Sequence, residues 1–151
     1  MKLRNLLGIA ALAVSLSATA LYAQATGSAA EAKAMLEKAV AELKANKAAA
    51  LAKFNEKTGA FRDRDLYVFC YNTGDGKFTA HPNEKLMGTD IRALKDPKGT
   101  PLGENIYKGA KEGSITTTDY EFPKAAGGPP VPKQSFITAV GDQGCGVGYY
   151  K

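Results

Sequence analysis

The stretch "YVFCYNTGDGKFTAHP", residues 67–82, predicts a β-hairpin. Aromatic and β-branched residues over 66–71 are typical of a strand, and the asparagine, glycines and aspartate that follow supply a tight turn. Residues 77–80 return as a second strand, which Pro82 ends. His81, the one histidine of the chain, therefore stands at the end of this hairpin.

Three further strands are expected downstream of the hairpin. Residues 113–120 form a threonine-rich run, and residues 133–140 and 144–150 are the other two β-prone runs. A short helix follows Thr100, and residues 123–132 form a loop rich in glycine and proline. With a long helix near the N-terminus, the pattern predicts an α+β fold in which that helix packs on a five-stranded antiparallel sheet.

The long helix is predicted from residue 29 to about residue 58. Ser28 and Glu31 have the spacing of a capping box, and Gly59 is a typical stop. Apolar residues recur at a helical period and form one stripe: Leu36, Val40, Leu43, Ala50, Leu51 and Phe54. A helix of this length would span about 45 Å. Its stripe requires either the chain's own sheet or a partner helix in a homodimer.

The first 23 residues have the layout of a secretory signal peptide, with cleavage after residue 23 or 25. A retained membrane anchor is the alternative, although the apolar stretch is short for a span. Removal of this peptide lowers the formal net charge from +5 to +3, because Lys2 and Arg4 leave with it. No run of like charges points to nucleic acid. We therefore expect a protein of the periplasm.

Expected export determines how the two cysteines are interpreted. In an oxidising compartment Cys70 and Cys145 are candidates for a disulfide, and two separate buried thiols are the alternative. If they bond, the first and last strands are neighbours. Their aliphatic side then lies under the long helix, and the other side sets three aromatic residues against three glycines. This leaves room for a small pocket, or it simply eases the twist of the last strand.

Enzymes and metal proteins find little support in this sequence. One histidine and two distant cysteines lack the paired spacing of a zinc site. No arrangement of histidine with serine or cysteine indicates a nucleophile. The "GCGVG" of the last strand precedes no helix, so it is no dinucleotide loop. We predict neither a catalytic activity nor a cofactor or metal.

Five segments taken in order resemble a known family: the hairpin, then "LMGTDIRALKDPKGTPL", "DYEFP", "PKQSF" and the terminal "GCGVGYY". Together they are similar to a single Cache domain of the second type, an extracytoplasmic relative of the PAS fold. The resemblance covers about residues 30–151, within a domain predicted over 28–151. It implies a five-stranded antiparallel sheet with adjacent first and last strands. It also implies a small extracellular ligand, often a short carboxylic acid.

The resemblance also implies ligand-binding residues. His81 before proline, Lys133 at the start of the fourth strand and Tyr120 in the third match family positions. With Tyr67 and Phe69 from the aromatic face of the first strand, they form the predicted site. An ammonium, an imidazole and phenol hydroxyls are the donors that a carboxylate requires. His81 would bind either as the imidazolium, with affinity falling above a pKa near 6.5, or as a neutral donor with a flat pH profile.

Structural roles are the alternatives for these residues. His81 could cap the hairpin, Lys133 could be a solvated strand start, and Tyr67 and Tyr120 could be core residues. The chain ends at Lys151, directly after the last strand. We therefore expect a free-standing periplasmic module that senses a small ligand and signals through a membrane receptor or kinase, with the long helix as the surface for docking or for a homodimer. A structural or assembly module that acts through that helix is the second interpretation.

Overall fold

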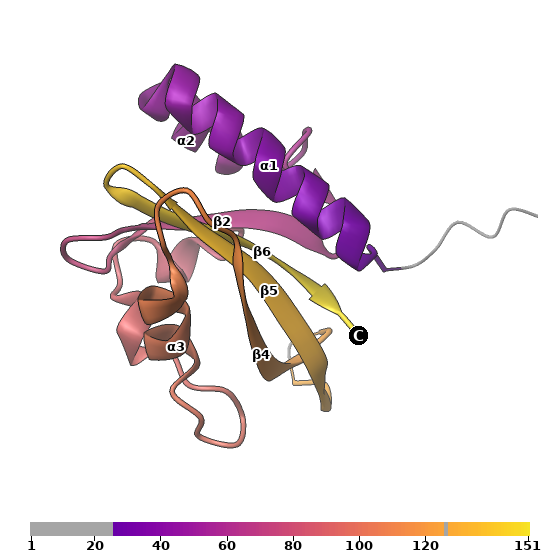
Figure 1. Ribbon diagram of the computed structural model, residues 1–151. Helices are drawn as coiled ribbons and strands as arrows, with labels where there is room; N and C mark the ends of the chain where they lie inside the picture. The colour runs from indigo at the N-terminus through magenta and orange to yellow at the C-terminus, as the bar shows by residue number, and fades with distance from the viewer. Residues whose placement is uncertain (1–25, 126) are drawn as a thin grey trace, which may run out of the picture.

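The computed structural model describes residues 26–125 and 127–151 (Figure 1). The predicted signal peptide over residues 1–23 lies outside these residues. Two helices cover one face of a sheet, and a third helix with its flanking segments covers the other (Figure 1). The expected α+β architecture is confirmed.

The sheet is antiparallel throughout and has the order β1-β2-β6-β5-β4, with β3 paired to β2. Its strands are β1 Arg62–Asp63, β2 Leu66–Asn72, β3 Phe78–Ala80, β4 Thr116–Pro123, β5 Pro130–Val140 and β6 Gln143–Tyr150. The five expected strands are present, and the two-residue β1 is an addition. The predicted loop over residues 123–132 is shorter than expected, because β5 begins at Pro130 and pairs with Pro123. The first and last long strands, β2 and β6, are neighbours, as the resemblance implied.

Helix α1, Ala29–Ala45, begins with the predicted capping box. The Ser28 N–H donates to Glu31 Oε2 at 2.8 Å, and the Glu31 N–H donates to Ser28 Oγ at 3.3 Å. Each side chain thus pairs a backbone donor that has no partner inside the helix.

The prediction of one uninterrupted helix over residues 29–58 is wrong. Asn46 is extended, with φ −161° and ψ 102°, and it separates α1 from α2, Lys47–Phe54. The physical reason is that the Asn46 side chain accepts the Ala49 N–H at 3.0 Å, so it acts as the N-cap of a new helix. Lys53 Nζ then lies 2.6 Å from Glu42 Oε2, so α2 folds back beside α1.

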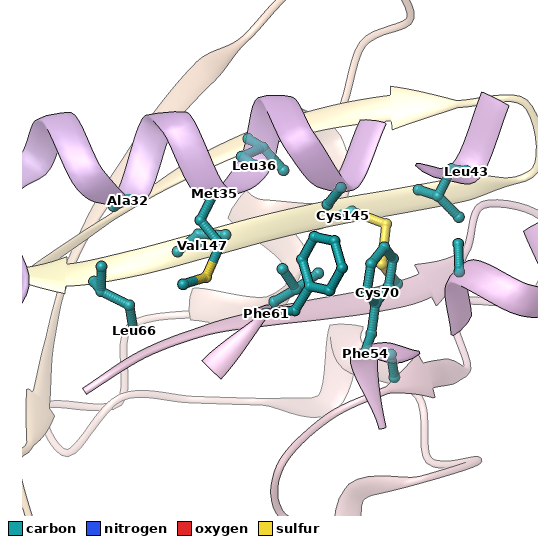
Figure 2. Packing of buried hydrophobic residues seen from close by; sticks show 14 residues of the cluster. Ala32, Met35, Leu36, Leu43, Phe54, Phe61, Leu66, Cys70, Cys145 and Val147 are labelled. Carbon is teal, nitrogen blue, oxygen red and sulfur yellow. A yellow bond between two sulfur atoms is a disulfide. The ribbon is translucent and has the colours of Figure 1, made fainter. Parts of the chain in front are cut away.

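Apolar side chains dominate the core between α1, α2 and the sheet. Figure 2 shows side chains of α1 directed onto β2 and β6 around the disulfide. Its most buried members are Ala32, Leu36, Ala39, Ala50, Leu66, Val68, Cys70, Ala80, Cys145 and Val147. Cys70 and Cys145 are directly opposite one another, with Cα atoms 4.1 Å apart, and they are bonded. The disulfide prediction is confirmed, and the aliphatic side of the strands lies under the helices.

The opposite face of the sheet carries a second core. Phe69 and Tyr71 of β2 and Ile137 of β5 meet the short helix α3, Leu102–Gly109, and the 3-10 turns η1, Glu84–Leu86, and η2, Ile91–Ala93. Helix α3 lies very close to η2, since a Cβ at Gly103 would overlap the Ile91 carbonyl. The segment between β3 and β4 is thereby fixed over the aromatic side of β2.

Candidate functional site

The glycine side of β6 accommodates large side chains. A Cβ at Gly144 would overlap the Tyr71 ring, and a Cβ at Gly146 would lie 2.5 Å from Phe69 Cζ. The space that the glycines leave is therefore filled by the aromatic residues opposite them. An open volume on this face lies further out, between these rings and the segment that runs from β3 to α3.

That volume is a cavity of about 80 Å³. Its apolar walls include Phe69, Phe78, Ile91, Leu102 and Ile106, and its polar side chains are Tyr67, His81 and Tyr120. The volume exceeds the ~15 Å³ that one water molecule needs. Four of the five predicted ligand-binding residues thus line one cavity with a largely apolar wall.

His81 is held in a defined orientation at the cavity. Its Nδ1 accepts the Asn83 N–H at 2.9 Å, and its own backbone N–H donates to Asn55 Oδ1 at 3.3 Å. Burial lowers the pKa of the imidazole to about 4. The ring is therefore neutral at pH 7, and because Nδ1 is an acceptor its proton lies on Nε2. The structural role foreseen for His81 uses Nδ1, which leaves Nε2–H as the donor group of the ring.

Lys133 is buried, with 2% of its surface exposed, so its interpretation as a solvated strand start is wrong. Its ammonium lies over three rings, at 4.5 Å from the centroid of Tyr150, 4.9 Å from that of Tyr67 and 5.6 Å from that of Phe122. Within residues 26–125 and 127–151, no carboxylate or hydrogen-bond acceptor pairs with it. Burial lowers the pKa of this ammonium to about 8.

The two tyrosines keep their protons. Burial raises the pKa of Tyr67 to about 12 and raises that of Tyr120 further. The Tyr120 hydroxyl lies 2.9 Å from Ser135 Oγ, above Gly148. A Cβ at Gly148 would come within 3.0 Å of both Tyr120 OH and Lys133 Cε. The third glycine therefore allows these two side chains to lie against the strand and beside each other.

Lys133 itself does not line the cavity. It lines a neighbouring surface hollow of about 520 Å³, together with Asp65 and Tyr150. Tyr67 and Phe122 line both spaces, so cavity and hollow meet at these two rings. The structure thus brings the predicted residues to one junction, with four on the cavity side and the ammonium on the other.

Sequence reasoning missed several residues of this junction. Phe122, Ser135 and Tyr150 each lie two residues from Tyr120, Lys133 and Gly148, so the two-residue period of a strand places them on the same face. The two-residue period could therefore have identified these three residues from the sequence. Asp65 lies in the turn between β1 and β2, where no periodicity applies, and nothing in the sequence marked it.

Two further observations concern what the described residues contain. Over residues 26–125 and 127–151, no three histidine, cysteine or acidic side chains gather as a metal site. In the same part of the chain, no helix combines the length and the apolar character that a membrane crossing requires.

Three solved structures are similar to this chain. A methyl-accepting chemotaxis protein from Vibrio parahaemolyticus RIMD 2210633 matches with a TM-score of 0.64 and 24% identity, over 80% of this chain and 86% of that chain. A periplasmic sensor domain of a chemotaxis protein matches at 0.59 and 23%, over 78% and 86%. A Cache chemosensory domain, reported for carboxylic acid recognition, matches at 0.56 and 22%, over 78% and 84%. These likenesses show a shared fold.

The family follows from the sequence match. A family model described as Cache domain matches residues 32–144, which is most of the chain. The match covers most of α1, the hairpin, α3 and the strands up to the start of β6. It confirms the resemblance stated from the five sequence segments. The chain belongs to the Cache domain family of extracytoplasmic sensor domains.

Proposed function

We propose that this domain senses a small molecule with a carboxylate group and a short apolar tail. The observation that carries the proposal is Lys133, a side chain with 2% of its surface exposed whose ammonium has no acceptor among the described residues. Burying an unpaired charge costs several kcal/mol unless a counter-charge arrives. A carboxylate ligand would supply that counter-charge at the junction of the cavity and the hollow.

The remaining donors fit the same head group. Tyr67, Tyr120 and His81 line the cavity side of the junction, and their hydroxyls and Nε2–H are hydrogen-bond donors. Hydrogen bonds from these groups to a carboxylate would add to the ion pair with Lys133. The apolar wall formed by Ile91, Leu102 and Ile106 then suits a tail of a few carbon atoms, because its small volume excludes large ligands.

The cavity also bears on the second interpretation, a structural module that acts through its helix. A packed interior would have favoured a scaffold, whereas an open cavity with donors around it supports ligand binding. Within this proposal the role is sensory rather than catalytic. Pairing of two copies through the N-terminal helix stays a prediction, which the break at Asn46 restricts to the 17 residues of α1.

Location and partner belong to the same proposal. A disulfide between Cys70 and Cys145 fits the oxidising periplasm, which supports export with removal of residues 1–23. Two similar structures come from chemotaxis proteins, which supports a membrane receptor as the partner. The bound state would then be passed to that receptor or to a kinase.

A thermal-shift screen of the purified protein tests the proposal. Acetate, propionate, lactate and pyruvate are compared with propylamine and propionamide, which keep the size and lack the carboxylate. A ligand that binds only the folded state at ~100 times its Kd adds about 2.7 kcal/mol to the unfolding free energy. We expect a raised midpoint with one or more carboxylates and none with the two controls. Equal midpoints with all six compounds would contradict the proposal.

A further inference from the structure

Asp65 carries an unused acceptor. Its Oδ1 accepts the Gly27 N–H at 2.5 Å, which holds the start of α1 against the turn between β1 and β2. Its Oδ2 is buried and is, among the described residues, the one buried side-chain nitrogen or oxygen without a hydrogen-bond partner. Buried polar atoms of native proteins nearly always have partners, so such an atom indicates a missing donor.

Asp65, the residue that carries the unused acceptor, lines the same hollow as Lys133, which carries the unused donor. Asp65, Lys133 and Tyr150 line it together. No ion pair within 4.0 Å joins Asp65 to Lys133 in the described part of the chain, although the carboxylate raises the pKa of the ammonium against the effect of burial. The two groups are therefore near each other without meeting. A ligand that brings an acceptor to Lys133 and a donor to Asp65 would satisfy both.

The charges of the hollow decide which donor suits Asp65. Arg62, Lys124 and Lys133 line it beside the single carboxylate of Asp65, and Arg64 lines it while paired to residues outside it. Basic groups thus outnumber the one acid even when Arg64 is set aside. A ligand ammonium would meet net positive charge, whereas a hydroxyl donates a hydrogen bond without adding charge.

We propose that Asp65 is a specificity-determining residue that accepts a hydrogen bond from a hydroxyl on the carbon next to the ligand carboxylate. The class of ligand is then a short α-hydroxy acid. Its carboxylate binds at Lys133, its hydroxyl binds at Asp65 Oδ2, and its remaining carbon atoms point to the apolar cavity. This inference rests on the proposed carboxylate function and adds a requirement that simple carboxylates do not meet.

Four ligands of three carbons test the inference by calorimetric titration of the purified protein. Lactate carries the hydroxyl next to the carboxylate, propionate lacks it, 3-hydroxypropionate moves it by one carbon, and alanine replaces it with an ammonium. A site that leaves a charged acceptor unpaired loses affinity, so lactate should bind at least about tenfold more tightly than propionate. Alanine and 3-hydroxypropionate should also bind more weakly than lactate.

The variant Asp65→Asn supplies the matched protein. It retains an acceptor for the Gly27 N–H and replaces Oδ2 by an amide N–H₂, which cannot accept from the ligand. We expect lactate affinity to fall about tenfold while propionate affinity stays within about twofold, so the preference disappears. The wild-type comparison of lactate with 3-hydroxypropionate tests the same point if the variant does not fold.

The outcomes distinguish the role of Asp65 from the proposed carboxylate function. Equal binding of lactate and propionate to the wild type, or a preference for alanine, would overturn the role of Asp65 and leave the carboxylate function standing. A preference for lactate that survives in Asp65→Asn would also overturn that role. Absence of binding by all four ligands would remove the proposed function and this inference together.

Discussion

The two faces of the sheet use burial in opposite ways. On the helix face, α1 and α2 cover Leu66, Val68 and Val147 in a mainly apolar core that contains a disulfide. On the other face, the rings of Phe69 and Tyr71 fill the space above two glycines, and next to them lie a cavity and a buried ammonium. One face stabilises the fold through apolar packing, while the other leaves a cavity and, among the described residues, an ammonium that has ring neighbours but no acceptor.

The proposed function assigns ligand binding to the second face and stability to the first. A residue of the apolar face gains stability from its neighbours, and its removal should weaken the fold and leave ligand binding intact. A residue such as Lys133 costs stability in the unliganded protein and should gain its partner only on binding. The two faces can therefore be distinguished by measuring the unfolding free energy and ligand affinity of the same variants.

The largest effect on the helix face should follow from loss of the disulfide. Replacing Cys70 and Cys145 together by alanine should lower the unfolding free energy by about 4 kcal/mol, because the bond closes a long loop in the unfolded chain. Urea unfolding of the variant measures this, with reduced wild-type protein as the control. Ligand affinity of the folded fraction should be unchanged. A loss below about 1 kcal/mol would show that the bond contributes little.

Leu36→Ala tests packing on the same face without touching the disulfide. Leu36 has no exposed surface, so its truncation should cost about 3 kcal/mol of unfolding free energy. Lys38→Ala, on the exposed side of the same helix, is the matched control and should stay within about 0.5 kcal/mol of the wild type. If Leu36→Ala also abolished ligand binding, the proposed independence of the two faces would be wrong.

Lys133→Met should have the opposite signature. Methionine fills a similar volume without a charge, so the unliganded protein should gain about 1–3 kcal/mol of unfolding free energy at pH 7. Carboxylate affinity should fall by about 1.5–3 kcal/mol, because a charge-assisted hydrogen bond is lost. Lys95→Met, at an exposed lysine that lines neither the cavity nor the hollow, is the control for hydrophobic substitution. A variant that is less stable and binds normally would place Lys133 among structural residues.

The sequence predicted the helix face better than the site face. Alternation in β2 and β6 put Cys70 on the face of Val68 and Cys145 on the face of Val147, because a period of two assigns faces without knowledge of the neighbours. The expectation that these faces coincide depended on the disulfide. The break between α1 and α2 at Asn46 was not predicted, because the helical period of apolar residues continues across it. The hydrogen bond from the Ala49 N–H to the Asn46 side chain, which starts the second helix, leaves no trace in that period. The rings around the Lys133 ammonium come from three different strands, and no local sequence pattern predicts that they lie close together.

Titration of Lys133 should make the site face sensitive to pH. Its folded-state pKa is about 8, below the ordinary 10.5. Between these values the unfolded chain binds a proton that the folded protein has released, so the unfolding free energy of the unliganded protein should rise with pH in this window. Carboxylate affinity should fall by up to about tenfold per pH unit above pH 8, as the ammonium loses its charge.

Lys133→Met is the control for both pH dependences, because without this ammonium neither the unfolding free energy nor the carboxylate affinity should change with pH in this range. Denaturant titrations at a series of pH values follow the unfolding free energy, and calorimetry follows the affinity. A wild-type affinity that stays constant from about pH 7 to pH 10 would exclude an ion pair with Lys133.

The smallest effect is expected for His81. Burial lowers its pKa to about 4, so the imidazole stays neutral over the range in which an ordinary histidine titrates. Carboxylate affinity should therefore change by less than about twofold between pH 5.5 and pH 7. Calorimetric titrations at these two pH values are sufficient. A clear decline as the pH rises toward 7 would mean that His81 binds as the imidazolium.

The most direct test of the account is the protonation of Lys133 itself, with and without ligand. The carbon-13 shift of lysine Cε follows the charge of the ammonium, and Lys133→Met assigns the signal. We predict a pKa of about 8 in the unliganded protein and a rise to above about 10 with a saturating carboxylate, because a bound anion favours the charged form. A pKa that is the same with and without bound carboxylate would contradict the claim that Lys133 binds the ligand.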